Sequence, residues 1–460
     1  MNYFSSRNKD LKLTFKDIFF KGLSVDGGLF LPSYIPQITD QELKNFEKYS
    51  FQEMSFKIFK YFIGDTFNDL QLKEIIDKAY SKFRNPNIVD VKKLDHISYV
   101  QLYHGPTLAF KDIAMQVLGG MYELLLKNEN IKINLVTATS GDTGAAAIDA
   151  IKNKKNVNIF VLHPYNKISS VQRQLMTNCE ANNVFNIAIK GTFDDCQKIV
   201  KDMFVDKDFS KKINMSGVNS INWARIIAQI VYYFYIYYKF NESKKSIVVS
   251  VPTGNFGDIY AGYVAKQMGL NIKELIVATN QNNILQRCIY SGEYRPLKVV
   301  ESISPSMDIQ VASNFERYLF YLCEGDSEKL NKMMSDLKTK GYFKLSNKQL
   351  DSLKNHFSAS SCNEDETLKI IKNIHIKFNY LIDPHTATGV KPLLDDKYKN
   401  EACYCFETAH PSKFPSAIFK AINSKPEFPD NFKIIQNKKE NLDILDNEIS
   451  QIKKYILEKI

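Results

Sequence analysis

The stretch IKINLVTATSGDTGAAAIDAIKN (residues 131–153) shows the local pattern that decides the fold. A short apolar run typical of a β-strand is followed by a glycine loop, and then by an Ala-rich run typical of a helix. Because the same strand–loop–helix order recurs along the chain, the sequence predicts a largely parallel sheet covered by helices on both faces.

The predicted fold class is therefore α/β, with two lobes built on mostly parallel sheets and an N-terminal helical segment. We expect residues 1–95 to form the mostly helical region, residues 96–235 a smaller α/β lobe, and residues 236–460 a larger α/β lobe. The candidate strands are, in chain order, residues 97–104, 131–139, 157–163, 184–191, 246–252, 272–280 and 402–408.

Three other segments have a distinct composition. Residues 223–240 are very apolar but include Arg225, Gln229 and several tyrosines, so they predict a buried core helix and not a membrane span. Residues 301–377 are expected to be helical and polar. The Lys/Asn-rich tail after Phe432 predicts a peripheral helix or a loosely held end.

The overall composition is that of a soluble globular protein, with 44% hydrophobic and 24% charged residues in a chain of 460. No run is apolar for long enough to cross a bilayer. The N-terminal residues lack the patterns of a secretory signal and of an organelle transit peptide. We therefore expect a cytoplasmic protein without a membrane partner.

The net charge of +10 raises the question of a nucleic-acid partner. Only 7 of the 61 basic residues are arginine, and the lysines are scattered among Asn and Ile along the whole chain. This distribution is typical of solvated faces, so we expect no nucleic acid as partner. The seven cysteines include no C-x-x-C pair, which predicts reduced thiols without a disulfide framework or a metal site.

The stretch HGPTLAFKDIAMQ (residues 104–116) places Lys111 in the first turns of a predicted helix. A cation is disfavoured there because that end of the helix dipole is positive. A solvated surface lysine is the common interpretation and stays open. The apolar stripe of the same helix places Lys111 at its edge, where the amine can reach a cleft, lose its proton and become reactive.

Two glycine loops follow predicted strands and precede predicted helices. In TSGDTGAAA (residues 139–147), Ser140 and Thr143 lie beside backbone N–H groups, which favours a carboxylate or phosphate site over a plain N-cap turn. PTGNFGDIYAG (residues 252–262) has neither the P-loop nor the G-x-G-x-x-G pattern. A phosphate at this second loop would be held mainly by backbone amides.

Two further segments have polar residues that a ligand could use. In FETAHPSKFP (residues 406–415), Thr408 ends a predicted strand, where its hydroxyl either caps the strand or hydrogen-bonds the ring nitrogen of a ligand. In GVNSINWARIIAQ (residues 217–229), Arg225 stands one turn into a very apolar helix. Its partner is either a core carboxylate or an anionic substrate.

Taken together, these segments supply a reactive lysine, two anion-binding loops, a hydroxyl and an arginine. A phosphorylated cofactor that forms an imine with a lysine fits this set of groups. The sequence therefore indicates pyridoxal 5′-phosphate as the cofactor.

The motifs HGPTLAFKD, SGDTGAAA, VPTGNFGD and ETAHPSKFP, in this order, resemble those of threonine synthase, a pyridoxal-phosphate enzyme of the tryptophan-synthase-β class (fold type II). DGGLFLP (residues 26–32) and NSINWARIIAQ (residues 219–229) resemble the same family. The resemblance implies conversion of O-phospho-L-homoserine and water into L-threonine and phosphate, by γ-elimination and β-addition of water, as the last step of threonine biosynthesis. The Lys/Asn-rich tail lies outside the resemblance.

The resemblance also implies residue roles. Lys111 is the implied catalytic residue and forms the imine with the cofactor, while Thr408 faces the pyridine nitrogen. The residues implied to hold the cofactor phosphate are Gly254, Asn255, Phe256, Gly257 and Asp258. The residues implied to bind substrate are Ser140, Asp142 and Thr143 in the carboxylate loop, and Asn219, Ser220 and Arg225 near the substrate phosphate.

Other hypotheses stay open at this point. One is another fold type II activity, such as a phosphoserine- or threonine-directed lyase, although no S-x-K-x-R-G stretch of the dehydratase kind is present. Another is a non-catalytic relative that keeps the fold and binds a ligand. The expected partner is the small-molecule substrate, and the expected oligomeric state is a monomer or a homodimer.

Overall fold

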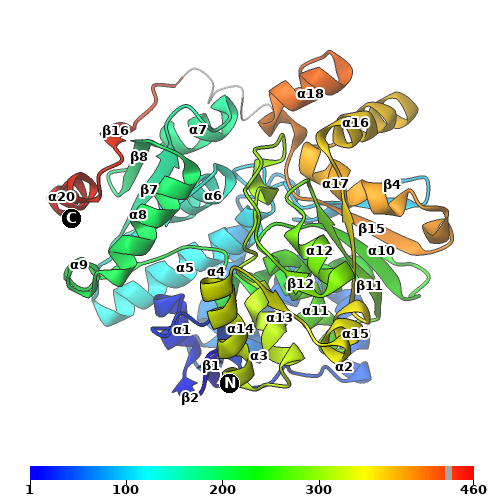
Figure 1. The fold of residues 1–460 in the computed structure, drawn as a ribbon, viewed down its shortest axis with the longest axis horizontal. Helices are drawn as coiled ribbons and strands as arrows, with labels where there is room; N and C mark the ends of the chain where they lie inside the picture. Colours follow the sequence, from blue (N-terminus) through cyan, green and yellow to red (C-terminus); the bar gives the residue numbers. More distant parts are fainter. Residues whose placement is uncertain (430–431, 433–437) are drawn as a thin grey trace.

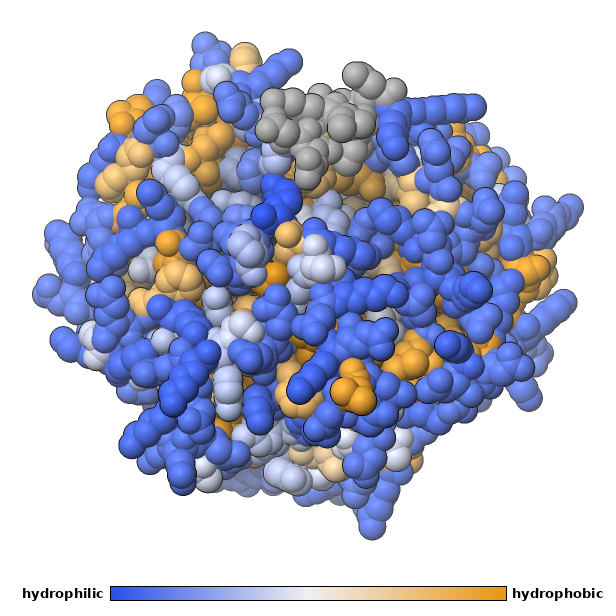
Figure 2. All heavy atoms as spheres, turned by 180° about the vertical axis from the view of Figure 1, so that it is seen from behind, coloured by the Kyte–Doolittle hydropathy of each residue, from blue (hydrophilic) through white to orange (hydrophobic). Residues whose placement is uncertain are grey.

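The computed structural model describes residues 1–429, 432 and 438–460. Two sheets of mainly parallel strands form its centre, each packed between helices (Figure 1). This is the predicted α/β class with two lobes. Figure 2 shows that hydrophilic side chains dominate the face seen from behind, as expected of a chain with 24% charged residues.

The first sheet has the strand order β16–β8–β7–β6–β9, and all its strands are parallel. Consecutive residues of β6 pack on opposite faces, Leu135 with α5 and α6 and Val136 with α8, α9 and α20. Burial of both faces explains why these strands are apolar at successive positions. The elements of this lobe are α5 (Lys111–Glu129), β6 (Ile133–Ala138), α6 (Asp142–Ile151), β7 (Val157–Pro164), α7 (Ser170–Thr177), β8 (Val184–Lys190), α8 (Phe193–Val205), α9 (Lys207–Lys212), β9 (Met215–Ser216), β16 (Asp443–Asp446) and α20 (Ile449–Lys459).

The second sheet has the order β14–β11–β10–β15–β5–β4, and only β4 runs antiparallel to its neighbour. Val249 packs toward α10 and α11, while Val248 packs toward α16, α17 and α18. The elements of this lobe are β4 (Asp90–Leu94), β5 (Ile97–Gln101), α10 (Trp223–Phe240), β10 (Ile247–Pro252), α11 (Gly257–Gln267), β11 (Ile272–Thr279), α12 (Ile284–Ser291), β14 (Phe357–Ser361), α16 (Glu364–Phe378), α17 (Pro384–Leu393), η3 (Asp396–Tyr398), β15 (Ala402–Glu407), η4 (Pro411–Lys413) and α18 (Pro415–Ile422).

The N-terminal region is mostly helical, as predicted, but it also contains a small antiparallel sheet of order β2–β1–β3. Thr14, Thr39, Ser50 and Asn68 each close a capping box at the start of a helix, which explains where these helices begin. The elements are β1 (Tyr3–Ser5), β2 (Asn8–Leu13), α1 (Phe15–Lys21), β3 (Phe30–Pro32), α2 (Asp40–Asn45), η1 (Phe46–Lys48), α3 (Phe51–Ile63) and α4 (Asp69–Tyr80).

The segment at 301–377 differs from its prediction. It is largely helical, but it also contributes the strand β14, which pairs with β11 at the edge of the second sheet. Its sequence FSASS is polar because an edge strand stays partly exposed, so it lacks the apolar run that marked the other strands. The remaining elements are β12 (Glu293–Tyr294), η2 (Pro305–Met307), α13 (Phe315–Leu322), α14 (Ser327–Lys340), β13 (Phe343–Lys344) and α15 (Asn347–Lys354).

The tail after Phe432 forms a peripheral helix, α20, as one of the two expectations had it. The part of this prediction that covers residues 433–437 lies outside the described residues. Ile452 and Ile456 are fully buried against α8, and β16 adds a strand to the first sheet. Packing and strand pairing therefore hold the described part of the tail to the first lobe.

The domain borders expected at 95/96 and 235/236 stay a prediction. The two sheets take strands from both sides of these positions, since β5 lies in the second sheet and β16 in the first. The helix α10 is buried along most of its length, as expected of a core helix. All seven cysteines are free thiols, and within the described residues no helix has both the length and the apolarity to cross a membrane.

Candidate active site

A cavity of about 560 Å³ lies at the loops that follow β6, β10 and β15. These are the carboxyl ends of strands from both sheets, where ligands of parallel α/β folds bind. Every residue that the sequence assigned to the site lines this cavity. The structure therefore brings all the predicted site residues together, although their individual roles stay predictions.

Lys111 is the first residue of α5 and is 8% exposed. Its Nζ lies 3.3 Å from Asp142 Oδ2 and 5.0 Å from the centre of the Phe110 ring. Burial lowers the pKa of Lys111, Asp142 opposes this effect, and the cations of Lys413 and Arg225 lower the pKa further. Lys111 is thus a buried amine that loses its proton more readily than a surface lysine.

The Gly-Pro-Thr sequence before Lys111 builds the turn that starts α5. The buried carboxylate of Asp112 accepts hydrogen bonds from the Thr107 N–H and hydroxyl, both at 2.7 Å. A Cβ on Gly105 would lie 2.3 Å from the Asp112 Cβ, so only glycine fits there. The turn fixes the start of the helix and with it the position of Lys111.

The loop between β6 and α6 is closed by a residue that sequence reasoning did not single out. Thr139 Oγ1 accepts hydrogen bonds from the N–H groups of Gly141 (3.0 Å) and Gly144 (2.9 Å). Gly141 has a φ of +132°, a conformation that favours glycine. Thr139 thus holds the loop in shape through these two hydrogen bonds, while Ser140 and Thr143 line the cavity.

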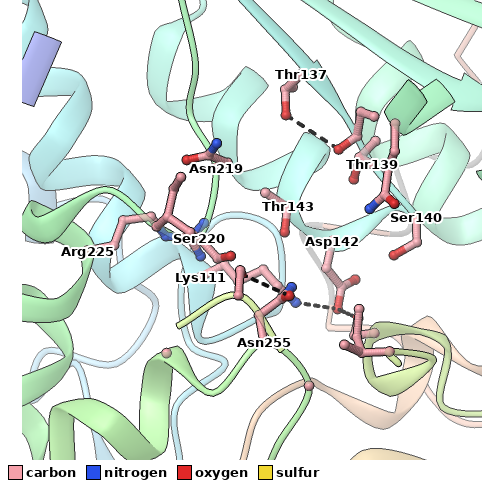
Figure 3. Close-up of a pocket in the computed structure, with 18 of the residues that line it drawn as sticks. Lys111, Thr137, Thr139, Ser140, Asp142, Thr143, Asn219, Ser220, Arg225 and Asn255 are labelled. Atoms are coloured by element: carbon pink, nitrogen blue, oxygen red, sulfur yellow. Dashed lines mark hydrogen bonds and ion pairs between the residues drawn. The ribbon is translucent and has the colours of Figure 1, made fainter. Parts of the chain in front are cut away.

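The side chain of Asp142 contacts two lysines, Lys111, which Figure 3 shows beside it, and Lys413. Its Oδ1 lies 2.7 Å from Lys413 Nζ and accepts a hydrogen bond from Gln172 Nε2 at 2.9 Å. Its Oδ2 accepts hydrogen bonds from Lys111 and from the Ser306 hydroxyl, both at 3.3 Å. Both carboxylate oxygens of Asp142 therefore already have partners within the protein. The group with which Asp142 can bind an anion is its backbone N–H.

The loop between β10 and α11 has the geometry of an anion site. Phe256 adopts the left-handed conformation with φ +63°, and its ring is buried against Phe315 and Phe357. No side chain caps the N-terminus of α11. The first backbone N–H groups of this helix are therefore available to a ligand, at the positive end of the helix dipole.

Asp258, in the first turn of α11, is a second buried carboxyl group of the cavity wall. Its Oδ1 accepts hydrogen bonds from the hydroxyls of Tyr232 (2.5 Å) and Tyr233 (3.2 Å). Burial raises the pKa of Asp258 to about 7, although the tyrosine hydrogen bonds and Lys111 oppose this. Burial therefore favours the neutral form of this group more than in a carboxyl group exposed to water.

Arg225 is 2% exposed, and its Nε and Nη1 have no hydrogen-bond partner within the part of the chain that the structure describes. Burial lowers its pKa to about 10. A core carboxylate was one of the two expected partners, and none of the described carboxylates forms an ion pair with it. A buried guanidinium of this kind, on the wall of a cavity, favours an anionic ligand.

Of the polar residues shortly before Arg225, one caps the helix α10 and two line the cavity. Asn222 caps α10, since its Oδ1 accepts from the Ala224 N–H at 3.0 Å and its Nδ2 donates to the Phe19 carbonyl at 3.0 Å. Asn219 and Ser220 line the cavity on the same side as Arg225 (Figure 3).

Thr408 reaches the cavity because its loop pairs with the loop of Lys111. The Phe110 N–H donates to the Thr408 carbonyl at 2.9 Å, and the His410 N–H donates to the Leu108 carbonyl at 3.0 Å. Thr408 is 5% exposed and lines the cavity. This backbone pairing brings the end of β15 to the start of α5.

Three residues of this region were missed in the sequence. Lys413 contacts Asp142, while Ser306 and His385 line the cavity and are joined by a hydrogen bond from the Ser306 N–H to His385 Nε2 at 3.3 Å. In the sequence, Lys413 lies in SKFP and His385 lies in DPHTATG. Their small and apolar neighbours were the sequence signal that could have indicated that both side chains are buried near the site. Ser306 gave no signal. Among the described residues, no cluster of three or more His, Cys, Asp or Glu side chains is arranged to hold a metal ion.

Comparisons with known proteins cover the whole chain. Residues 2–80 match the family "Threonine synthase N terminus", residues 87–403 match "Pyridoxal-phosphate dependent enzyme", and residues 386–456 match "Threonine synthase, C-terminal". A threonine synthase of Pseudomonas aeruginosa is 38% identical, over 99% of this chain and 98% of the relative. That of Schizosaccharomyces pombe is 39% identical, over 95% and 92%. The crystal structure of a PLP-bound threonine synthase from Brucella melitensis superposes with a TM-score of 0.96 at 40% identity, over 100% and 99% of the two chains.

Proposed function

The chain belongs to the threonine synthase family, and from this premise we propose how its cavity carries out the family's reaction. The activity is that of a threonine synthase, with pyridoxal 5′-phosphate as cofactor, and it converts O-phospho-L-homoserine and water into L-threonine and phosphate. The observation that carries the residue assignments is the meeting of all four sequence motifs at one cavity around a buried lysine.

The loop after β10 fits the phosphate of this cofactor. The N-terminus of α11 has no side-chain cap, and a Cβ on Gly254 would lie 2.6 Å from the Ser306 carbonyl oxygen, so the loop presents backbone and no side chain at this point. The raised pKa of Asp258 reduces the negative charge beside that phosphate. The residues proposed to hold the phosphate through their amides are Gly254, Asn255, Phe256, Gly257 and Asp258.

Lys111 is the proposed catalytic residue. Bound pyridoxal 5′-phosphate supplies an aldehyde that takes up an amine and a ring that withdraws electrons from the carbon atoms next to that amine. With the cofactor bound, Lys111 would hold its aldehyde, and the free Nζ would accept the proton of the substrate α-carbon. The same amine then moves protons at the β-carbon, where water adds.

Thr408 is proposed to face the pyridine nitrogen. A hydroxyl carries no negative charge, so Thr408 would not favour protonation of this nitrogen as a carboxylate partner would. Thr408 would thereby moderate the electron withdrawal and limit side reactions such as transamination. The 5% exposure of Thr408 supports this role, because bulk water does not compete for the hydrogen bond.

The substrate is proposed to bind between the two sides of the cavity. The loop of Ser140, Asp142 and Thr143 receives the carboxylate at the start of α6. Asn219, Ser220 and Arg225 receive the phosphate on the opposite side. The buried guanidinium of Arg225, whose Nε and Nη1 have no hydrogen-bond partner among the described residues, supports this assignment, because it would stabilise the negative charge of the departing phosphate in a site that excludes water.

The remaining expectations are also part of the proposal. We place the protein in the cytoplasm, which is consistent with seven free thiols. We expect a monomer or a homodimer.

The test of the function is a product assay with the cofactor-loaded protein and O-phospho-L-homoserine. Inorganic phosphate and L-threonine are quantified in the same samples, and equal amounts of the two are expected. Phosphate released together with 2-oxobutyrate would mean elimination without correct addition of water. If neither product forms, turnover of serine, phosphoserine and threonine identifies a related lyase, and retention of the cofactor without any turnover identifies a non-catalytic binder.

A further inference from the structure

Lys413 is a second buried lysine beside the site, and the proposed mechanism leaves it without a task. It is the last residue of η4 and is 0% exposed. Its Nζ lies 2.7 Å from Asp142 Oδ1 and donates to the Thr107 carbonyl at 2.8 Å. An ammonium group so far from water stays charged only when it is paired.

Asp142 is the group that joins Lys413 to Lys111. Each of its two carboxylate oxygens faces one lysine, and the start of α6 favours a negative charge there. Burial alone would raise the pKa of Asp142, but Lys413 first and Lys111 second hold it well below its usual range. The carboxylate is therefore ionised, and it contacts both lysine side chains.

The contacts are not shared equally. Lys413 makes the shorter contact, 2.7 Å against 3.3 Å for Lys111, and it has a second acceptor in the Thr107 carbonyl. Lys111 lines the cavity, whereas Lys413 does not. One carboxylate balances the charge of one ammonium group. Of the two lysines, Lys111 makes the longer contact with Asp142, so it is the one that gives up its proton.

The other charged groups that face Lys111 do not change this balance. Arg225 from α10 is a further cation, and it also lowers the pKa of Lys111. Asp258 from α11 is held by the hydroxyls of Tyr232 and Tyr233 and has its pKa raised to about 7. Asp142 is thus the ionised carboxylate that Lys111 contacts.

We infer that Lys413 is a positioning residue that acts as the permanent counter-ion of Asp142, so that Lys111 presents a neutral amine to the cavity. Lys413 does not line the cavity, and its Nζ contacts Asp142 and the Thr107 carbonyl, so it acts through the carboxylate. The inference deepens the proposed function and rests on it for what the amine reacts with. The quantity that it predicts, the proton affinity of Lys111, is a property of the protein without cofactor or substrate.

The experiment measures the proton affinity of Lys111 in full-length protein freed of cofactor. Trace acetic anhydride acetylates neutral amines over a series of pH values, and peptide mass spectrometry reports the labelling of Lys111, with exposed Lys9 as internal standard. Lys413→Met should raise the midpoint of Lys111 labelling by about one pH unit or more, because Asp142 then has Lys111 as its remaining lysine partner. Lys413→Arg keeps the positive charge and should leave the midpoint close to that of the unaltered protein.

A second pair of variants decides the question if Lys413→Met does not fold. In Asp142→Asn two ammonium groups lie close together without an anion, so the labelling midpoint of Lys111 should fall. Adding Lys413→Met to this variant removes one cation, and the midpoint should rise again by about one unit. The inference is overturned by equal midpoints within this pair, by a folded Lys413→Met with an unshifted midpoint, or by a Lys413→Arg shift as large as that of Lys413→Met.

The labelling needs neither substrate nor turnover, so its outcome is separate from that of the product assay. A protein that makes no threonine but shows the predicted midpoint shifts would retain the inference and lose the proposed function. The reverse result would retain the function and remove the role of Lys413.

Discussion

The two glycine loops of the cavity share one architecture, but the pKa of the buried carboxyl group is shifted in opposite directions in the two loops. Each loop follows a parallel strand and starts a helix, with Asp142 in the first turn of α6 and Asp258 in the first turn of α11. Asp142 faces two lysines, which hold its pKa well below the usual range. Asp258 is hydrogen-bonded by two tyrosines, and burial raises its pKa to about 7.

The difference shows that the neighbouring charges, and not the local fold, set the ionisation of a buried carboxyl group. The ionised Asp142 contacts the reactive lysine. The partly neutral Asp258 belongs to the loop proposed for a phosphate, where a full negative charge would repel the ligand. One structural unit therefore places an ionised carboxylate beside Lys111 in the first loop and a carboxyl group with a raised pKa in the loop proposed for a phosphate.

The largest effect is expected where the first loop meets the amine. Lys111→Ala removes the group proposed to hold the cofactor and move the proton, so kcat should fall by about 10³-fold or more. The assay is phosphate release from O-phospho-L-homoserine. Lys127→Ala, at an exposed position near the other end of α5, is the matched control and should leave kcat unchanged. Full activity of Lys111→Ala would remove the catalytic assignment.

The second prediction contrasts the stability of the two carboxyl sites. Asp142→Ala leaves Lys413 buried without an anion, so the free energy of unfolding should fall by roughly 3 kcal/mol or more. Asp258→Asn keeps an acceptor for the tyrosine hydroxyls and should cost about 1 kcal/mol or less. Urea unfolding of both variants measures the difference. Equal losses would contradict the contrast drawn between the two loops.

The third prediction concerns Arg225 on the cavity wall, whose Nε and Nη1 have no hydrogen-bond partner among the described residues. Arg225→Met removes a guanidinium that is suited to bind the substrate phosphate, and kcat/KM should fall by about 10- to 100-fold. The same change removes an unpaired buried charge, so the free energy of unfolding without ligands should stay the same or rise. Steady-state kinetics and urea unfolding check the two parts. A strong loss of stability would indicate a structural partner for Arg225.

Taken per pH unit, the smallest effect is the change in the slope of stability against pH that Asp258 causes, with Tyr232, Tyr233 and Lys111 as the groups facing it. The folded protein has the higher pKa at this group, so it binds more protons than the unfolded chain between about pH 4 and pH 7. The free energy of unfolding therefore loses about 1.4 kcal/mol per pH unit from this group as pH rises through that range. Asp258→Asn should remove this contribution, as measured by urea unfolding at several pH values. Parallel curves for the two proteins would show that Asp258 is not neutralised on folding.

Much of this arrangement follows from local sequence. The apolar runs predicted the strands β6, β7, β8, β10, β11 and β15, because strands buried on both faces are apolar at successive positions. The loops after them contain glycines and hydroxyls at strand ends, which placed the cavity. The residues assigned to the site line that cavity for this reason.

The features that were missed depend on contacts between distant parts of the chain. The edge strand β14 is polar and gave no apolar run, and β16 joins the first sheet only through its pairing with β8. Lys413 was not assigned to the site from the sequence, because its role depends on its distance from Asp142 in space. The unequal pKa values of Asp142 and Asp258 likewise depend on partners that stand far away in the sequence.

The place of β15 in the second sheet has a consequence for folding during synthesis. This strand lies between β10 and β5, yet it follows both of them in the chain. The ribosome must therefore release most of the protein before the two halves of the sheet can join. Thr408 follows directly after β15, and Lys413 ends the short helix η4 that comes next. The nascent chain thus completes the cavity in the same late step that completes the second sheet. A chain that lacks β15, or that has not paired it, has neither a complete cavity nor a complete second sheet.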